Sequence, residues 1–261
     1  MTVHAHSSGD RFGMQQEKSG TILWLTGWSF PNTVFDRLHS LLPEFHHITV
    51  DYYSTAATPE EMLKLTERAV RDDLSLHAAS TAKGPLLIAG WSLGALLALR
   101  LAEKAGADGL LLLAGTARFT RPKEQKDRGW PDAHVRQMIK SLMKDRQEAE
   151  TKFRQSVFTE AEWEAGLGAT LPPAGGWTTS ALIAGLQILQ SEECLSLLPE
   201  MVRPALLIHG TEDHICPFGA AEELERMAQS LSAGGRDGEM DRAHARKLAA
   251  ALRRLASDPW N

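Results

Sequence analysis

The sequence predicts an α/β fold: a mostly parallel central sheet, covered by helices on both faces, with a helical segment inserted between two strands. Short apolar runs alternate with helical patterns, which is typical of parallel strands buried on both faces. One apolar run ends in a tight glycine-flanked turn that opens directly into a helix. The alternation stops between residues 118 and 199, where helical periodicity continues without a convincing strand.

The strands are expected where the apolar runs lie: residues 21–25, 48–51, 85–89, 109–113 and 205–209. The helices of this part are expected at residues 33–42, 59–80, 93–105 and 219–231. Asn32 is the expected cap of the first helix, and Thr58 with Glu61 forms a capping box for the second.

The chain therefore divides into three predicted parts: a flexible leader at 1–19, a core at 20–117 and 200–261, and a helical lid at 118–199. In the lid, Pro131 and Asp132 open a helix. Its expected apolar face consists of Val135, Met138, Ile139, Leu142 and Met143.

Composition narrows the class of protein. A chain of 261 residues with 43% hydrophobic residues suits one large α/β domain, and a net charge of −5 does not favour nucleic-acid binding. The longest apolar stretch, 86–99, is too short and too polar to span a membrane, and the first residues do not form a signal peptide. Cys194 and Cys216 form no metal or redox motif, so we expect free thiols in a cytoplasmic monomer without cofactor or metal.

Ser92 is the candidate nucleophile, within Gly90-Trp91-Ser92-Leu93-Gly94. It lies where an apolar strand ends and a helix begins, which is the context of a nucleophile elbow. Flanking glycines relieve the crowding of such a turn, and the helix N-terminus favours negative charge near the serine. The alternative is an ordinary strand-to-helix turn that contains a serine.

A nucleophilic serine needs a base, and the base needs an orienting acid. Asp213 follows the strand at 205–209, at the sheet edge where active sites of parallel sheets form. Glu212 is the competing carboxylate, and Asp213 could instead only cap a turn.

The expected order of the three groups is serine, acid, histidine, and only His214 and His244 follow Asp213. His214 is the immediate neighbour of the acid and is poorly placed to reach Ser92, while His209 precedes the acid and is expected to be packed. His244 is therefore the predicted base by elimination, its alternative being a surface residue that opens a helix at 245–256.

The oxyanion hole is expected to use two backbone N–H groups. One belongs to Leu93, directly after the nucleophile, and the other to Trp28 in the loop after the first strand. Gly27 would allow the backbone to approach closely, or would serve only as a turn residue.

With these residues placed, the chain resembles the α/β-hydrolase superfamily and, within it, the pimeloyl-ACP methyl ester carboxylesterases of biotin synthesis. The segments that carry the likeness are Leu25-Thr-Gly-Trp28, Gly90-Trp-Ser-Leu-Gly94, Gly185-Leu-Gln-Ile-Leu189 and Gly210-Thr-Glu-Asp213. The resemblance implies a metal-free serine esterase with a helical lid, acting on an acyl chain carried by a protein. A thioesterase or lactonase would use the same groups, and a non-catalytic binding protein on the same fold is the competing hypothesis.

Basic residues concentrate in the predicted lid, with eleven Lys or Arg against six Asp or Glu between residues 118 and 154. Arg136, Lys140 and Lys144 are spaced four apart and form a stripe on one helix. The stripe is either a solvated surface or, as the resemblance implies, the docking site of an acidic acyl carrier protein or its phosphopantetheine phosphate.

Overall fold

The structure is a computed structural model that describes residues 19–79, 84–102, 104–174, 176–198 and 204–232. Five parallel strands form one sheet in the order β2-β1-β3-β4-β5. Their bounds are β1 (Gly20–Leu25), β2 (Phe45–Thr49), β3 (Leu86–Trp91), β4 (Gly109–Leu113) and β5 (Ala205–Ile208). The predicted parallel sheet is confirmed.

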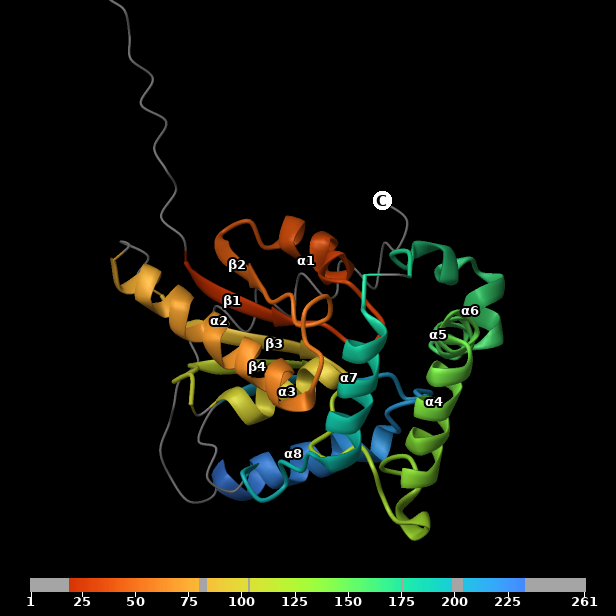
Figure 1. Cartoon of the computed structure of the whole chain (residues 1–261). Coiled ribbons are helices and arrows are strands. Elements are labelled where there is room, and N and C mark those ends of the chain that lie inside the picture. Colours follow the sequence, from red (N-terminus) through yellow and green to blue (C-terminus); the bar gives the residue numbers. More distant parts are fainter. Residues whose placement is uncertain (1–18, 80–83, 103, 175, 199–203, 233–261) are drawn as a thin grey trace, which may run out of the picture.

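Helices pack on both faces of the sheet (Figure 1). Those outside the β4–β5 connection are η1 (Asn32–Phe35), α1 (Asp36–Leu41), α2 (Pro59–Ala79), α3 (Leu93–Ala102) and α8 (Phe218–Ser232). Alternate side chains of β1 enter different clusters: Leu23 and Leu25 pack with α3, whereas Ile22 and Trp24 pack on the opposite face with α1.

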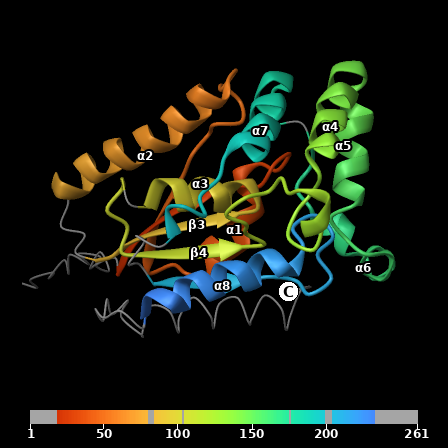
Figure 2. The same ribbon diagram turned by 90° about the horizontal axis from the view of Figure 1, so that it is seen from below.

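A run of helices separates β4 from β5, although these two strands are neighbours in the sheet. It contains η2 (Lys123–Gln125), α4 (Asp132–Lys144), α5 (Arg146–Gln155), α6 (Glu160–Glu164), η3 (Leu167–Thr170) and α7 (Thr179–Ser191). Figure 2 shows β3 and β4 pointing toward the side of the molecule that α4 and α5 occupy. The carboxyl ends of the strands therefore face the inserted helices.

Several local predictions were wrong in detail. Asn32 does not cap the first helix, because its Nδ2 donates to the carbonyl of Val50 at 3.2 Å and the cap position belongs to Pro31. β2 begins at Phe45, earlier than expected, and Met143 is 73% exposed rather than part of an apolar face.

The capping box predicted at Thr58 is only partly formed. Thr58 Oγ1 accepts from the Glu61 N–H at 3.2 Å as predicted, while the Glu61 carboxylate accepts from Ala57 instead of Thr58. Cys194 and Cys216 are free thiols. Within the described part of the chain, no helix has the length and apolar character needed to cross a membrane.

Candidate active site

Ser92 occupies a strained turn between β3 and α3. Its φ of +53° lies in the left-handed region, a conformation that costs a serine on the order of 1–3 kcal/mol and persists only where the surroundings impose it. The Ser92 N–H donates to the Leu113 carbonyl at 2.9 Å, and the Ser92 carbonyl accepts from Ala95 and Leu96. The turn is thus held by β4 on one side and by the first turn of α3 on the other.

The two flanking glycines allow contacts that any larger residue would prevent. A Cβ on Gly90 would lie 2.2 Å from the Gly94 carbonyl oxygen, and a Cβ on Gly94 would lie 1.9 Å from the Leu25 carbonyl oxygen. These are backbone atoms of the core, so they cannot move aside cheaply. The spacing Gly-x-Ser-x-Gly therefore reflects close packing of the turn against β1 and α3.

A small cavity brings three of the candidate residues together. It is lined by Gly27, Trp28, Phe30, Trp91, Ser92, Ala114, Phe153, Val157, Asp213, Ile215 and Cys216. Leu93 is fully buried behind Ser92 as the first residue of α3. None of the described residues that line this cavity is a histidine.

Asp213 is fixed by the loop that follows β5. Its Oδ1 accepts hydrogen bonds from the N–H groups of Ile215 and Cys216, both at 2.8 Å. Asp213 therefore orders its turn and also presents its carboxylate at the cavity that contains Ser92. Glu212 is exposed and lines a neighbouring cavity that does not include Ser92.

Two described histidines lie near Asp213, and neither of them lines the cavity of Ser92. His209 Nε2 lies 2.5 Å from the Cys216 carbonyl and 3.8 Å from Asp213 Oδ2, with its side chain only 4% exposed. His214 is exposed on the neighbouring cavity, and its carbonyl accepts from the Trp130 indole. His244 lies outside the described residues, so its role as the base stays a prediction.

Of the two predicted oxyanion donors, Trp28 lines the cavity of Ser92, and Leu93 directly follows Ser92 in the chain. As the first residue of α3, Leu93 has its N–H at the start of the helix, where backbone donors lack intrahelical partners. Trp28 lies in a turn closed by the bond from Phe30 N–H to the Gly27 carbonyl at 3.2 Å. Its indole donates to the Leu182 carbonyl at 2.7 Å, which anchors the turn to α7.

Gly185 of α7 packs against both of these residues. A Cβ there would lie 2.9 Å from Trp28 Cδ1 and 3.0 Å from Leu93 Cδ2. This contact explains why the segment Gly185–Leu189 begins with a glycine. The sequence pattern by itself does not reveal that reason.

Cys216 is a residue of the cavity that the sequence analysis missed. Its Sγ lies 3.7 Å from Ser92 Oγ. Burial, with a further contribution from Asp213, raises the pKa of the Cys216 thiol to about 12. The thiol is therefore neutral near pH 7 and acts as a weak hydrogen-bond partner of the serine, not as a second base.

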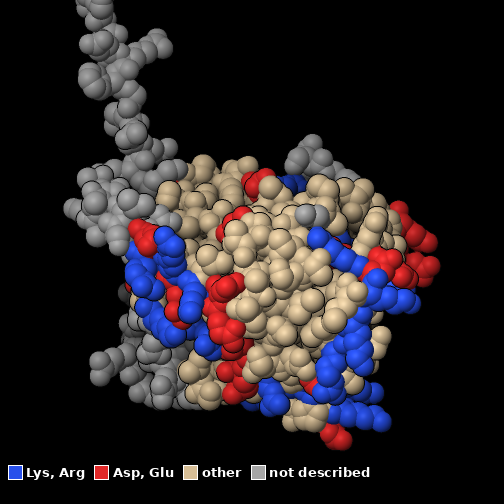
Figure 3. Space-filling model, viewed as in Figure 1, with Lys and Arg blue, Asp and Glu red and all other residues tan. Residues whose placement is uncertain are grey.

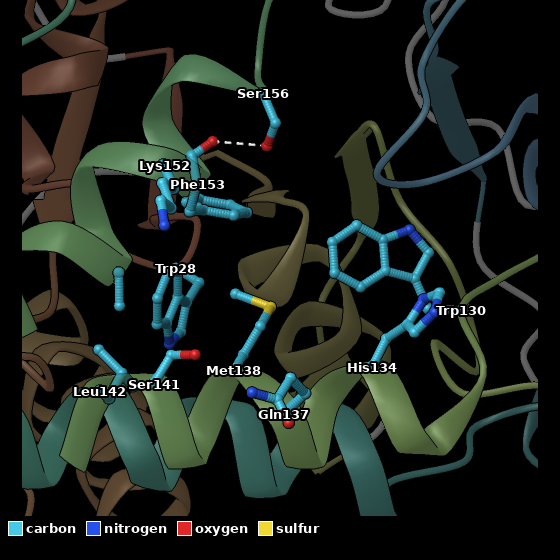
Figure 4. Close-up of a pocket in the computed structure, with 11 residues that line it drawn as sticks. Trp28, Trp130, His134, Gln137, Met138, Ser141, Leu142, Lys152, Phe153 and Ser156 are labelled. Carbon is cyan, nitrogen blue, oxygen red and sulfur yellow. Dashed lines mark hydrogen bonds between the residues drawn. The ribbon is translucent and has the colours of Figure 1, made fainter. Parts of the chain in front are cut away.

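An apolar pocket of about 310 Å³ adjoins the cavity of Ser92, between α4 and α5. Figure 4 shows Trp28 and Phe153 facing this pocket together with Met138 of α4. Trp28 and Phe153 line both spaces, and their rings meet edge to face at 4.7 Å. A substrate with its reacting carbon at Ser92 could thus extend an apolar chain past these two rings.

The predicted basic stripe lies on α4, with Arg136, Lys140 and Lys144 all exposed. Lys and Arg side chains gather along the edge of the molecule that carries α4 and α5 (Figure 3). Arg136 is paired with Asp132 one turn earlier on the same helix. Because successive residues of a helix are turned by about 100°, the stripe lies on the helix surface next to Gln137. Gln137 and other α4 side chains line the apolar pocket.

The family model of the alpha/beta hydrolase family matches residues 4–255, and the chain belongs to this family. It is 29% identical over 220 residues to a pimeloyl-[acyl-carrier protein] methyl ester esterase of Nitrosomonas europaea, covering 78% of this chain and 82% of that protein. It is 29% identical over 250 residues to the protein of the same name in Xanthomonas oryzae pv. oryzae, covering 90% and 94%.

Solved structures share the fold at lower identity. An esterase from Exiguobacterium antarcticum superimposes with a TM-score of 0.62 at 20% identity, covering 80% of each chain. A bromoperoxidase from Bacillus anthracis gives 0.64 at 14% identity, covering 92% of each chain. These neighbours define the fold alone.

Proposed function

We propose that this chain is a carboxylesterase that uses Ser92 as its nucleophile. The observation that carries the proposal is the strained serine at the start of α3, on one cavity with the carboxylate of Asp213. Ser92 Oγ attacks the ester carbonyl while the base, proposed as His244, takes its proton and returns it to the departing alcohol. The N–H groups of Trp28 and Leu93 stabilise the oxyanion, and water then releases the acid from the acyl-enzyme.

We propose that the acyl chain occupies the apolar pocket between α4 and α5. The pocket shares Trp28 and Phe153 with the cavity of Ser92, so the reacting carbon and the chain could be bound together. In this interpretation the helices of residues 118–199 form a lid, and substrate selectivity depends on side chains such as Met138.

The proposed substrate is an acyl chain attached to an acyl carrier protein, as in the names of the two relatives. The exposed stripe of Arg136, Lys140 and Lys144 supports this proposal. It lies beside the pocket, and its positive charge would attract an acidic carrier protein. Carrier-bound acyl chains belong to cytoplasmic metabolism, so we propose a cytoplasmic enzyme.

The decisive experiment combines labelling by an active-site phosphonate with hydrolysis of p-nitrophenyl esters of increasing chain length. The wild type should be labelled and active, and Ser92→Ala should lose both, with a rate loss on the order of 10⁴-fold or more. His244→Ala should be nearly as damaging. An unlabelled wild type would favour the non-catalytic binding protein, while faster hydrolysis of thioesters or lactones would reassign the substrate class.

A charge-reversal variant tests the carrier. Replacing Arg136, Lys140 and Lys144 by glutamate should lower kcat/KM for an ester bound to the carrier protein, most strongly at low salt. Hydrolysis of a small neutral p-nitrophenyl ester should barely change. Equal losses on both substrates would show that the lid itself was disturbed, and no loss on either would leave the stripe as a solvated surface.

A further inference from the structure

Ser29, directly after the proposed oxyanion donor Trp28, has an unusual backbone conformation. Its φ is +69°, and it is the second central residue of the turn from Gly27 to Phe30. A turn with positive φ at that position is normally occupied by glycine or asparagine. Ser29 is 1% exposed, so this conformation is imposed inside the protein.

The side chain of Ser29 is held by a buried carboxylate from the inserted helices. Ser29 Oγ donates to Glu150 Oε1 of α5 at 2.9 Å, and Glu150 is only 4% exposed. Arg146 donates through Nε to the other oxygen, Oε2, at 2.8 Å and also to the Trp177 carbonyl. The carboxylate is therefore ion-paired and cannot turn away from Ser29 without leaving Arg146 unpaired.

The backbone of Ser29 is held by a second buried side chain, one turn further along α5. Arg154 Nη1 donates to the Ser29 carbonyl at 2.9 Å, and its guanidinium lies 4.4 Å from the centre of the Phe30 ring. The same guanidinium donates to the Pro172 carbonyl. Glu150 and Arg154 thus hold the hydroxyl and the carbonyl of one strained residue from consecutive turns of a single helix.

We propose that Glu150 and Arg154 are positioning residues for the oxyanion hole, an inference that rests on the proposed esterase function. By fixing Ser29 at positive φ, they fix the turn that directs the Trp28 N–H toward the reacting oxygen. The oxyanion hole is then complete only when α5 is seated on this turn. Neither residue touches the reacting atoms; both act through Ser29.

The test uses Ser29→Gly as a rescue, because glycine adopts positive φ without help. Four enzymes are compared with the wild type: Glu150→Ala, Glu150→Gln, Ser29→Gly and the double variant Ser29→Gly/Glu150→Ala. Glu148→Ala is the matched control on the same helix, because Glu148 is exposed and pairs only with Lys152 among the described side chains. Each is measured for kcat, KM, thermal unfolding and inhibition by a trifluoromethyl ketone, which forms a tetrahedral oxyanion.

Glu150→Ala should lower kcat about 10-fold, less than the 10²–10³-fold lost with a whole oxyanion donor, while KM stays within about 3-fold. Inhibition by the trifluoromethyl ketone should weaken in parallel. Glu150→Gln keeps an acceptor for Ser29 and should lose less, and Glu148→Ala should match the wild type. In the Ser29→Gly background, Glu150→Ala should cost less than about 3-fold, because glycine no longer needs the clamp.

Equal losses from Glu150→Ala in both backgrounds would overturn the proposal and make Glu150 only a support of the lid. A loss confined to KM or to thermal stability would overturn it as well. A wild type that fails phosphonate labelling and ester hydrolysis would instead refute the esterase, which keeps the two failures distinct.

Discussion

Two serines in the left-handed conformation flank the candidate oxyanion site, and they are held there in different ways. Ser92, at φ +53°, is held by backbone: the Leu113 carbonyl, the first turn of α3 and two glycines packed against main-chain atoms. Ser29, at φ +69°, is held by side chains from α5, more than 120 residues later in the chain.

This contrast separates the site into two halves with different origins. The contacts that hold Ser92 come from β1, β3, β4 and α3. The Ser92 half therefore forms once these elements pack together. The Ser29 half needs the inserted helices to be seated correctly. In the proposed mechanism, the sheet and α3 therefore hold Ser92 and the Leu93 N–H, while the inserted helices determine whether the Trp28 N–H is in place.

The largest expected effect comes from disrupting the Ser92 half, which is held by backbone contacts. In Gly94→Ala the new Cβ would lie 1.9 Å from the Leu25 carbonyl oxygen, so β1 and α3 would have to separate. We expect a loss of about 3 kcal/mol or more in the free energy of unfolding, which lowers Tm by roughly 10 °C, or no folded protein at all.

Gly210→Ala is the matched control for that measurement. A Cβ at Gly210 meets no atom closer than 3.9 Å, so its Tm should stay within about 2 °C of the wild type. A Gly94→Ala protein with wild-type Tm would show that the elbow does not depend on this close packing.

The predicted catalytic acid, Asp213, gives the next largest effect. Asp213→Asn should lower kcat by about 10²–10⁴-fold, because an amide no longer orients the base or stabilises its charged form. Glu212→Gln should stay within about 3-fold, since Glu212 is exposed and outside the cavity of Ser92. The reverse ranking in steady-state kinetics would assign the acid to Glu212.

The same division explains what the sequence could predict. The parallel sheet, the glycine-flanked turn at Ser92 and the loop of Asp213 follow from short patterns whose meaning is local: an apolar run, a glycine spacing, a strand end. Their geometry is therefore readable before the fold is known. The catalytic roles of Ser92, Asp213 and His244 remain predictions.

The Ser29 half could not be predicted from local sequence patterns. Glu150 and Arg154 have the i, i+4 spacing of an ordinary exposed ion pair, and only the packing of α5 on the turn of Ser29 reveals that both are buried. Cys216 beside Ser92 and Gly185 against Trp28 are likewise products of tertiary contacts. Met143 shows the converse error, an apolar residue at helical spacing that points to solvent.

The smallest effect concerns the stability of the sheet at its other face, away from both serines. His39 of α1 stacks on His47 of β2 at 4.5 Å and contacts Trp24 at 5.3 Å. Burial lowers the pKa of His39 below its usual 6.5; the charge of His47 adds to this shift, and Asp36 partly offsets it.

Because the folded state disfavours protonated His39, this contribution to stability is complete above the unfolded pKa of about 6.5 and declines as pH falls through the lower folded value. We expect Tm to fall by about 1–3 °C between pH 7 and pH 5.5 through this group, and His39→Gln, which cannot titrate, to show a flatter profile. Thermal unfolding of both proteins across that range measures the difference, and it cancels the carboxylates that titrate alike in each. Parallel profiles would show that His39 does not contribute to the pH dependence.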